Sequence, residues 1–378
     1  MMRRVGVEEE FLIVDNADGH AVPLGELLER LSDDDGLSRE MKQEQIETCT
    51  LPRISLDELA QDITVRRVSA DATARAIGAR SVALTTSPLP VQSTTSPGLR
   101  YERMIERFGL TAVEQLTCGC HVHVEVESDE EGVAVLDRIR IWLPVLMAIT
   151  VNSPFWNGTD SGYASYRSQA WNRWPTAGPC EIFGSAGAYH RQVNEILGSG
   201  VLLDRGQIYF DARLSHRHPT VEVRVGDVCL FADDAVLLAG LVRGLVETAA
   251  KQWRNGVPPA PVSATQLRLA SWQAGRFGLD GDLLDPLTGR PRPAFEVAMA
   301  LLDHVQAALK SQGEFDVVES LLFQVLTRGT GAARQRAAFA EAGSLCDVIA
   351  DAVHISSLPA TPLQTLRGLP LLATDQSS

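Results

Sequence analysis

The stretch that decides the fold is Pro219-Thr-Val-Glu-Val-Arg-Val-Gly226, in which apolar and polar residues alternate. Successive side chains of a strand point to opposite faces, so the three valines are predicted to pack into a core. Glu222 and Arg224 then project together from the other face. A carboxylate beside a guanidinium can hold a cation and an anion at once, which predicts a binding site on this face.

The N-terminal segment Val5–Asp15 has a similar alternation and is predicted to be a strand. Its parity places Glu8 and Glu10 on one face and Glu9 on the apolar face. Like charges two residues apart on one face repel, so a bound cation is one reason to tolerate them. An ordinary solvated strand face is the alternative.

A second long strand is predicted over Gln43–Thr50, where Glu47 lies between Ile46 and Thr48. This carboxylate is a candidate metal ligand. Glu40 precedes the strand pattern and is a candidate to reach the same place from a loop. The alternative for both residues is a surface carboxylate.

The segment Cys118–Glu127 is rich in cysteine and histidine and is predicted to be another strand. His121 and His123 share the face of Glu125, whereas the cysteines fall on the apolar face. A closed zinc site would need both faces to converge, and the chain has no second cysteine pair at zinc spacing. The two histidines are therefore either ligands beside the carboxylates or ordinary side chains.

A fourth strand is predicted over Gln207–Leu214, with Asp211 and Arg213 on its polar face. The region 153–188 is predicted to be a long loop that carries Arg167 among Gly, Ser and Tyr residues. A guanidinium matches carboxylates and phosphates bidentately, so Arg167 is a candidate clamp for a substrate anion.

Strand after strand therefore has an apolar face and a charged face. If the sheet curls so that the charged face is concave, the carboxylates, imidazoles and arginines gather there. Oxygen-rich ligands with few imidazoles suit Mg2+, or alternatively Mn2+, better than zinc. The sequence has no Walker motif, no Gly-x-Gly-x-x-Gly after a strand and no Gly-x-Ser-x-Gly elbow.

Beyond the charged strands the chain is mostly helical. Helices are predicted from Ser55 to about Arg80, over 97–108, over 128–150 as one long helix and over 189–197. After Phe231 nearly all of the pattern is helical, at 231–254, 263–275, 294–310, 314–327 and 331–353. Hairpin-like spacing with a helical C-terminal third predicts an α+β fold with an antiparallel sheet.

Composition limits the classes of protein. The 378 residues are 45% hydrophobic, and no linker divides them, which predicts one catalytic domain over 1–378. Its strands lie mainly within 1–230 and its helical region over 231–373. The net charge of -14 argues against nucleic-acid and membrane-surface partners.

The start of the chain is acidic where a signal peptide would be apolar, and the apolar run 141–151 is too short to span a bilayer. A cytoplasmic location is expected. The 6 scattered cysteines fit reduced thiols.

Taken together, these motifs resemble the carboxylate–amine ligase family related to glutamate–cysteine ligase, within the glutamine-synthetase-like superfamily. The matching segments fall in family order over nearly the whole chain: Gly6-Val-Glu-Glu-Glu-Phe11, Gln45-Ile-Glu-Thr48, His121-Val-His123, Ser165-Tyr-Arg167, Trp174-Pro-Thr-Ala-Gly178, Asp211-Ala-Arg213, Thr220-Val-Glu-Val-Arg-Val225 and Gly331-Ala-Ala-Arg-Gln-Arg336.

The resemblance implies a curled antiparallel half-barrel with flanking helices, which binds ATP and Mg2+ on its concave face. It implies the metal ligands Glu8, Glu10, Glu40, Glu47, His121 and Glu222. The resemblance also places Arg224 at the transferred phosphate and Arg167 at the substrate, with Arg213 and Asp211 near the nucleotide. Phe210 and Leu214 stand where part of the family has Trp and Pro.

The implied activity is ATP-dependent amide-bond formation through an acyl phosphate, with glutamate and cysteine as the family-level substrates. The small-molecule partners would be an amino-acid carboxylate and an amine, and a homodimer is one option. Two alternatives stay open from the residues alone. One is a metal-dependent hydrolase that uses His121 and His123, and the other is a non-catalytic regulator that binds ATP and Mg2+.

Overall fold

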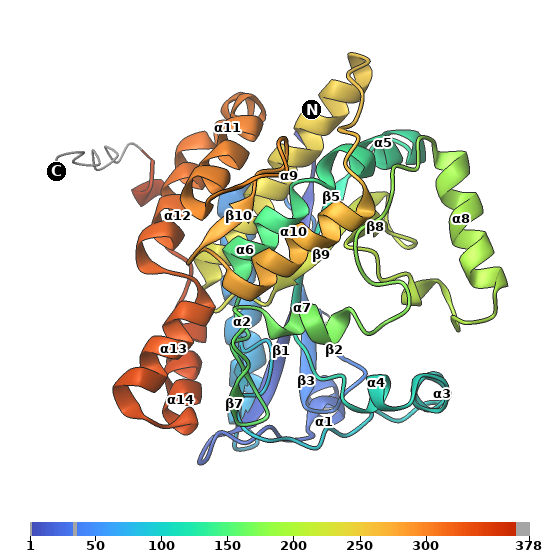
Figure 1. Cartoon of the computed structure of the whole chain (residues 1–378). Helices are drawn as coiled ribbons and strands as arrows, with labels where there is room; N and C mark the ends of the chain where they lie inside the picture. The colour runs from blue at the N-terminus through green and yellow to red at the C-terminus, as the bar shows by residue number, and fades with distance from the viewer. Residues whose placement is uncertain (1, 33–35, 368–378) are drawn as a thin grey trace.

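The computed structural model describes residues 2–32 and 36–367, and its centre is a seven-stranded antiparallel sheet (Figure 1). The strand order is β2-β3-β1-β5-β9-β8, and β4 pairs with the end of β1. The bounds are β1 (Val5–Asp15), β2 (Leu37–Arg39), β3 (Gln45–Cys49), β4 (Ala79–Val82), β5 (Gly119–Glu125), β8 (Ala212–Leu214) and β9 (Thr220–Asp227). The expected mixture of helices with an antiparallel sheet is confirmed.

The apolar face of this sheet forms the main core. Val221, Val223 and Val225 of β9 are buried with Val122 and Val124 of β5, as their parity predicts. The same hydrophobic cluster includes residues of α9 (Ala232–Arg254), α11 (Ala294–Gln312) and α12 (Phe315–Arg328). The helical C-terminal third therefore covers the side of the sheet that faces away from its charged residues.

The remaining helices surround this core (Figure 1). They are α1 (Gly25–Leu31), α2 (Leu56–Arg75), α3 (Leu99–Phe108), α4 (Leu110–Val113), α5 (Asp129–Ile139), α6 (Leu143–Thr150), α7 (Tyr166–Trp171), α8 (Ala186–Gly198), α10 (Ala264–Phe277), α13 (Gly331–Ala342) and α14 (Leu345–Ser356). Two small hairpins complete the fold, β6 (Phe155–Trp156) with β7 (Thr159–Asp160) and β10 (Asp282–Leu284) with β11 (Pro291–Pro293).

Two predicted helices are each divided in the structure. The expected helix over 128–150 is α5 and α6, because Pro144 lies in the first turn of α6 and cannot continue a preceding helix. The expected helix over 331–353 is α13 and α14. Gly343 ends α13 in the left-handed conformation, with φ 73°, and Ser344 caps α14.

The fourth predicted strand is shorter than expected. Of the residues predicted for it, only Ala212–Leu214 form a strand, β8, which pairs with β9, and a 3-10 turn over Arg205–Gln207 precedes it. The loop predicted over 153–188 contains α7. Short irregular segments of this kind lack the periodicity on which sequence prediction depends.

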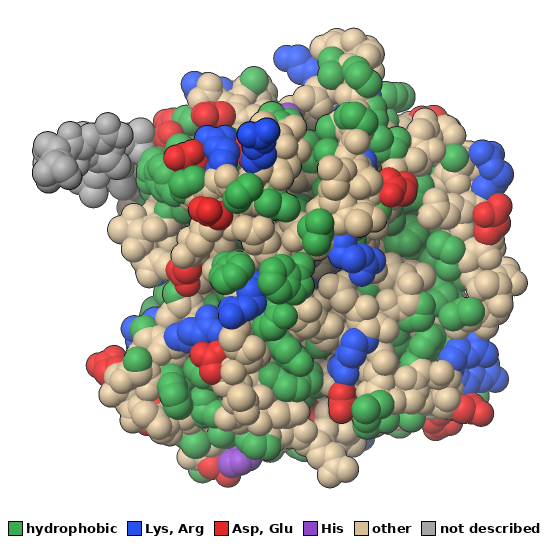
Figure 2. Space-filling model, viewed as in Figure 1, with side chains coloured by type: hydrophobic (Ala, Val, Ile, Leu, Met, Phe, Trp, Pro, Cys, Tyr) green, Lys and Arg blue, Asp and Glu red, His purple; other side chains and the backbone are tan. Residues whose placement is uncertain are grey.

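The cysteines and the charged surface agree with a chain that has reduced thiols and no basic binding face in the view of Figure 2. All six cysteines lie in described positions and are free. Over 2–32 and 36–367, no helix has the length and apolarity needed to cross a membrane. Lys and Arg side chains are scattered among acidic and apolar ones on the face in Figure 2 and form no continuous basic surface there. The last part of the predicted helical region, 368–373, lies outside the described residues.

Candidate active site

Strand register brings the predicted site residues together in a row across the sheet. Glu8 of β1 is opposite His121 of β5, and Glu10 is opposite Glu47 of β3. On the other side of β5, His123 is opposite Glu222 of β9. Cross-strand neighbours on one face lie about 5 Å apart, so the register alone makes these side chains neighbours.

A local irregularity in β5 adjusts this row. The pairing of β5 with β9 shifts between Cys120 and Val122, which places His121 at the shift. Bulges of this kind re-aim a side chain and increase the local twist of the sheet. His121 is 3% exposed and its Nε2 has no hydrogen-bond partner in the structure.

The charged face of the sheet lines a cavity of about 900 Å³. Its walls carry every predicted metal ligand, namely Glu8, Glu10, Glu40, Glu47, His121 and Glu222. His123, Arg213 and Arg224 also line it. The cavity is large enough for a nucleotide or a similar small molecule.

The candidate ligands form three overlapping groups in which all ligand atoms lie within 4.8 Å of one another. The groups are Glu8 with Glu47 and His121, Glu8 with His123 and Glu222, and Glu10 with Glu40 and Glu47. Glu8 and Glu47 each belong to two groups. Carboxylate-rich groups at this spacing fit Mg2+ or Mn2+, and the unpartnered Nε2 of His121 is available as a ligand atom.

The pKa shifts within the group Glu10, Glu40 and Glu47 also favour a bound cation. Burial and, next, the neighbouring Glu40 carboxylate raise the pKa of Glu10 to about 7. Burial and the Glu40, Glu8 and Glu10 carboxylates hold the pKa of Glu47 well above its ordinary value. Three half-buried acids that repel one another are costly without a cation, and a bound cation would remove that cost.

The histidines give Glu8 a different environment. Burial by itself would raise the pKa of Glu8, but contacts with His121 and His123 lower it below its usual range. The Nδ1 of His121 lies 3.4 Å from Glu8 Oε2. His123 Nδ1 is fixed at 3.0 Å by the Thr220 hydroxyl, and its Nε2 faces Glu8 Oε1 at 3.2 Å.

Glu222 is held between two arginines. Arg213 binds it bidentately, with Nε at 2.7 Å from Oε2 and Nη2 at 3.1 Å from Oε1, and Arg224 also donates to Oε1. Burial would raise the pKa of Glu222, but the two guanidinium groups keep it well below the ordinary value. Glu222 therefore joins the metal-ligand groups to the cationic side of the cavity.

Two residues predicted for the site lie elsewhere. Arg167 is 3% exposed and donates to the backbone carbonyls of Arg224 and Val225. Asp211 lies beside Arg268, although Tyr209 and Arg213, predicted on the same face, line the cavity. Neither Arg167 nor Asp211 lines the 900 Å³ cavity, so their contacts with substrate or nucleotide stay predictions.

The cavity also has walls that the sequence reading missed. Arg100, Tyr101 and Met104 of α3 line it, as do residues 204–206 and 215–218. The basic run His216-Arg217-His218 directly before the decisive strand was a visible signal. The sequence gave no signal for the residues of α3, because their place in the cavity wall depends on how this helix packs against the sheet.

Trp171 and Trp174 both line the cavity, and they differ in their contacts. Trp174 is 3% exposed, and its Nε1 donates to Gln115 Oε1 at 3.0 Å, as expected of an anchor. Trp171 lines the cavity with its ring beneath the guanidinium groups of Arg167 and Arg224, at 5.5 and 5.8 Å.

The fold and site define an α+β protein whose antiparallel sheet carries an acidic, arginine-edged cavity. Comparison with protein families is consistent with this class. The chain belongs to glutamate–cysteine ligase family 2, whose family model matches residues 4–351.

Relatives in this family cover nearly the whole chain. A Streptomyces avermitilis protein named "Putative glutamate--cysteine ligase 2-1" is 50% identical over 358 residues, which are 93% of this chain and 99% of that protein. A Paenarthrobacter aurescens protein named "Putative glutamate--cysteine ligase 2-3" is 53% identical over 337 residues, 89% of this chain and 80% of that protein.

Solved structures share the fold at low sequence identity. A Francisella tularensis glutamate–cysteine ligase in complex with AMP has a TM-score of 0.70 and 14% identity, over 99% of this chain and 90% of that one. A bifunctional glutathione synthetase from Pasteurella multocida has a TM-score of 0.69 and 15% identity, over 94% of this chain and 52% of that one.

Family membership confirms two expectations from the sequence. The family is the one that the motifs resemble, and the enzyme class is that of ATP-dependent ligases that form carbon–nitrogen bonds. It gives no support to the alternative of a metal-dependent hydrolase.

Proposed function

We propose that this protein joins an amino-acid carboxylate to an amine at the acidic cavity, at the expense of ATP. The observation that carries the proposal is the set of three overlapping ligand groups, which lies beside Arg213 and Arg224 in one cavity. Carboxylates for cations and guanidinium groups for phosphates are the parts that phosphoryl transfer requires. Glutamate and cysteine are the proposed substrates, because the relatives are named for them.

In the proposed reaction a carboxylate oxygen of the acid attacks the γ-phosphorus of ATP, and ADP leaves. The amine nitrogen then attacks the acyl carbon, inorganic phosphate leaves, and the amine gives up a proton. Bound Mg2+ or Mn2+ would neutralise phosphate charge. Such chemistry depends on positioning and charge more than on a protein nucleophile.

The chain's own residues have separate parts in this proposal. Glu8, Glu10, Glu40, Glu47, His121 and Glu222 would hold the metal ions. Arg224 would face the transferred phosphate, and Arg213 would keep Glu222 in place. The charged face is proposed to be concave, as in a half-barrel, which the cavity volume of about 900 Å³ supports. A single catalytic domain over 1–378, a cytoplasmic location and a homodimer stay proposals.

The test uses Glu47→Gln. This carboxylate has neighbouring acids that raise its pKa, so the change removes repulsion instead of a stabilising pair. We expect the metal-free variant to unfold at or above the wild-type temperature. ADP formation from ATP and Mg2+, measured with panels of amino acids and amines, should fall about 100-fold.

Glu130→Gln is the matched control, since Glu130 is exposed on α5. It should keep full ADP formation. Full activity of Glu47→Gln would refute the metal assignment. Binding of ATP and Mg2+ by the wild type without turnover of any substrate would instead indicate a regulator.

A further inference from the structure

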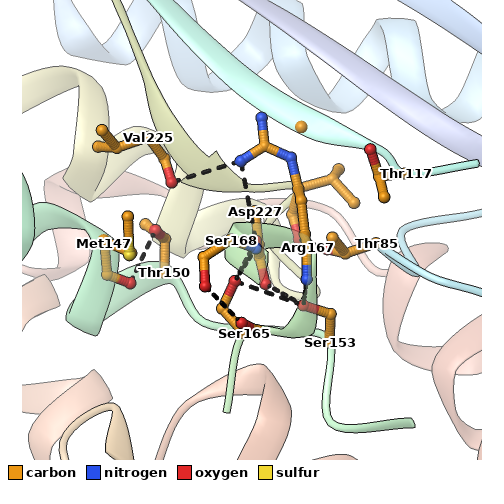
Figure 3. A network of polar contacts seen from close by, with 12 residues as sticks. Thr85, Thr117, Met147, Thr150, Ser153, Ser165, Arg167, Ser168, Val225 and Asp227 are labelled. Carbon is orange, nitrogen blue, oxygen red and sulfur yellow. Dashed lines mark hydrogen bonds and ion pairs between the residues drawn. The ribbon is translucent and has the colours of Figure 1, made fainter. Parts of the chain in front are cut away.

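A buried hydrogen-bond network lies around Arg167 and has no part in the proposed reaction so far (Figure 3). Its centre is Asp227, the last residue of β9, which is 1% exposed. Oδ2 of Asp227 accepts from the Ser153 hydroxyl at 2.7 Å and from the Asn152 amide at 2.8 Å. Its Oδ1 accepts from the Ser165 hydroxyl at 2.9 Å.

The two hydroxyls hold the first turn of α7. Ser165 caps this helix by accepting from the Ser168 amide at 3.2 Å, and Ser153 accepts from the Arg167 amide at 3.1 Å. A serine hydroxyl has a single proton, and here each one is given to Asp227. The lone pairs of the two serine oxygens can then accept from the backbone amides of Arg167 and Ser168 in α7. Asp227 therefore orients the hydroxyls that hold the helix.

The guanidinium of Arg167 lies between the Asp227 carboxylate and the backbone of Gly119. On one side, its Nη1 is 3.9 Å from Asp227 Oδ1. On the other side it stands against Gly119, where an added Cβ would be 2.6 Å from Arg167 Nη2. The amide of Gly119 donates to Glu10 Oε2 at 2.6 Å, so Arg167 supports the Glu10 side of the site without lining the cavity.

This placement has an electrostatic consequence. Glu10 belongs to the group with Glu40 and Glu47, and cations held there would repel the guanidinium of Arg167. A carboxylate on the far side of Arg167 offsets that repulsion and keeps the side chain in place. Asp227 supplies that carboxylate.

The network also gives a role to the C-terminal motif Gly331–Arg336. Gln335 of α13 donates to the carbonyl of Asn152 at 2.9 Å and to its Oδ1 at 2.7 Å. Asn152 is next to Ser153, and its backbone amide donates to Asp227. A helix far along the chain therefore fixes the segment that orients α7.

We propose that Asp227 is a positioning residue, which holds α7 through Ser153 and Ser165 so that Arg167 keeps Glu10 in place for the ligand group Glu10, Glu40 and Glu47. The proposal rests on the metal site of the proposed function. Outer residues that orient metal ligands affect metal affinity by about 10- to 100-fold when they are changed.

The test measures Mn2+ binding to the ATP-free protein by electron paramagnetic resonance, with Asp227→Asn against the wild type. We expect about 10-fold weaker binding at one site, and a lower kcat for ADP formation with less change in the KM for ATP. Asp234→Asn is the control, because Asp234 is also buried and both of its carboxylate oxygens accept from Arg328 Nη2, at 2.7 and 2.9 Å. It should lose stability while keeping wild-type Mn2+ affinity.

Ser165→Ala is the second variant, since it removes one of the two hydroxyls through which Asp227 holds α7 and does not change a residue that lines the cavity. It should weaken Mn2+ binding as Asp227→Asn does, even if the latter fails to fold. Wild-type Mn2+ affinity in either folded variant would overturn the positioning role. A wild type that binds Mn2+ without turning over ATP would refute the ligase proposal alone, and one that binds no Mn2+ would overturn both.

Discussion

Three consecutive glutamates of β1 have two different environments. Glu8 and Glu10 line the cavity, whereas Glu9 is 2% exposed on the core face and paired with Arg67. The Arg67 guanidinium binds it bidentately, with distances of 2.6 and 3.0 Å. Parity predicted this separation, because a strand alternates its faces whatever its neighbours are. It gave no indication of Arg67, which comes from α2.

At the scale of single residues, Asp211 predicts a pH dependence of stability. Burial raises its pKa to about 7 from an ordinary value of 3.8, so the folded protein binds this proton more tightly than the unfolded chain. The stabilisation is complete below about pH 4 and is lost as the pH rises to about 7. Asp211→Asn should therefore unfold at a higher temperature than the wild type at pH 8, with a difference that shrinks toward pH 4.

Thermal unfolding followed by circular dichroism across this range measures the effect. Asp282→Asn, an exposed change on β10, should show no such trend. A lower unfolding temperature of Asp211→Asn at pH 8 would contradict the assignment.

At the scale of elements, the strands were easier to predict than the segments between them. β1, β5 and β9 lie where alternation placed them, because each has one buried and one polar face. β8 and α7 were misjudged, since three- and six-residue elements have too few residues to show a period. Arg167 lies in α7, where the sequence predicted a loop, and its contact with substrate stays a prediction.

The contact between α13 and Asn152 can be tested with a substitution at Gly331. A Cβ on Gly331 would lie 2.2 Å from Asn152 Oδ1, so Gly331→Ala must displace a side chain that is 1% exposed. Overpacking of this kind costs about 1–3 kcal/mol of unfolding free energy, measured by urea denaturation.

Gly198→Ala is the control for this change. Gly198 is also helical and has no atom within 4 Å of the added Cβ, so its variant should be neutral or slightly stabilised. Equal stability of the two variants would show that α13 does not pack tightly against Asn152.

At the scale of the whole molecule, α9 joins the sheet to the helical third. It contacts β5, α5, α11 and α12, and all but a few residues of its first five turns are buried. Arg243 in its middle is fully buried and binds both Glu314 of the loop before α12 and the carbonyl of Ile54. The Arg243 side chain thus joins α9 to α12 through its ion pair and to the start of α2 through its hydrogen bond.

Loss of this pair should destabilise the whole fold. Arg243→Met leaves Glu314 buried without its cation, which costs about 3–5 kcal/mol in urea denaturation. Glu296→Gln on α11 breaks the exposed pair with Arg292 of β11, at 2.8 Å, and should cost less than about 1 kcal/mol. Similar losses for the two variants would contradict a special role of Arg243.

The sequence by itself determined which side chains face the core and which face the site, because strand parity is a local property with a period of two. It also determined the family, since the motifs are short and keep their order along the chain. The tertiary structure decided which of these charges meet. The meeting of Glu40 with Glu10, of Asp227 with Ser165, and of Gln335 with Asn152 depends on packing between distant segments. Pro219–Gly226 therefore predicted a charged face, whereas the ends of β9 and α7 decided that Arg167 lies between Asp227 and Gly119, outside the cavity.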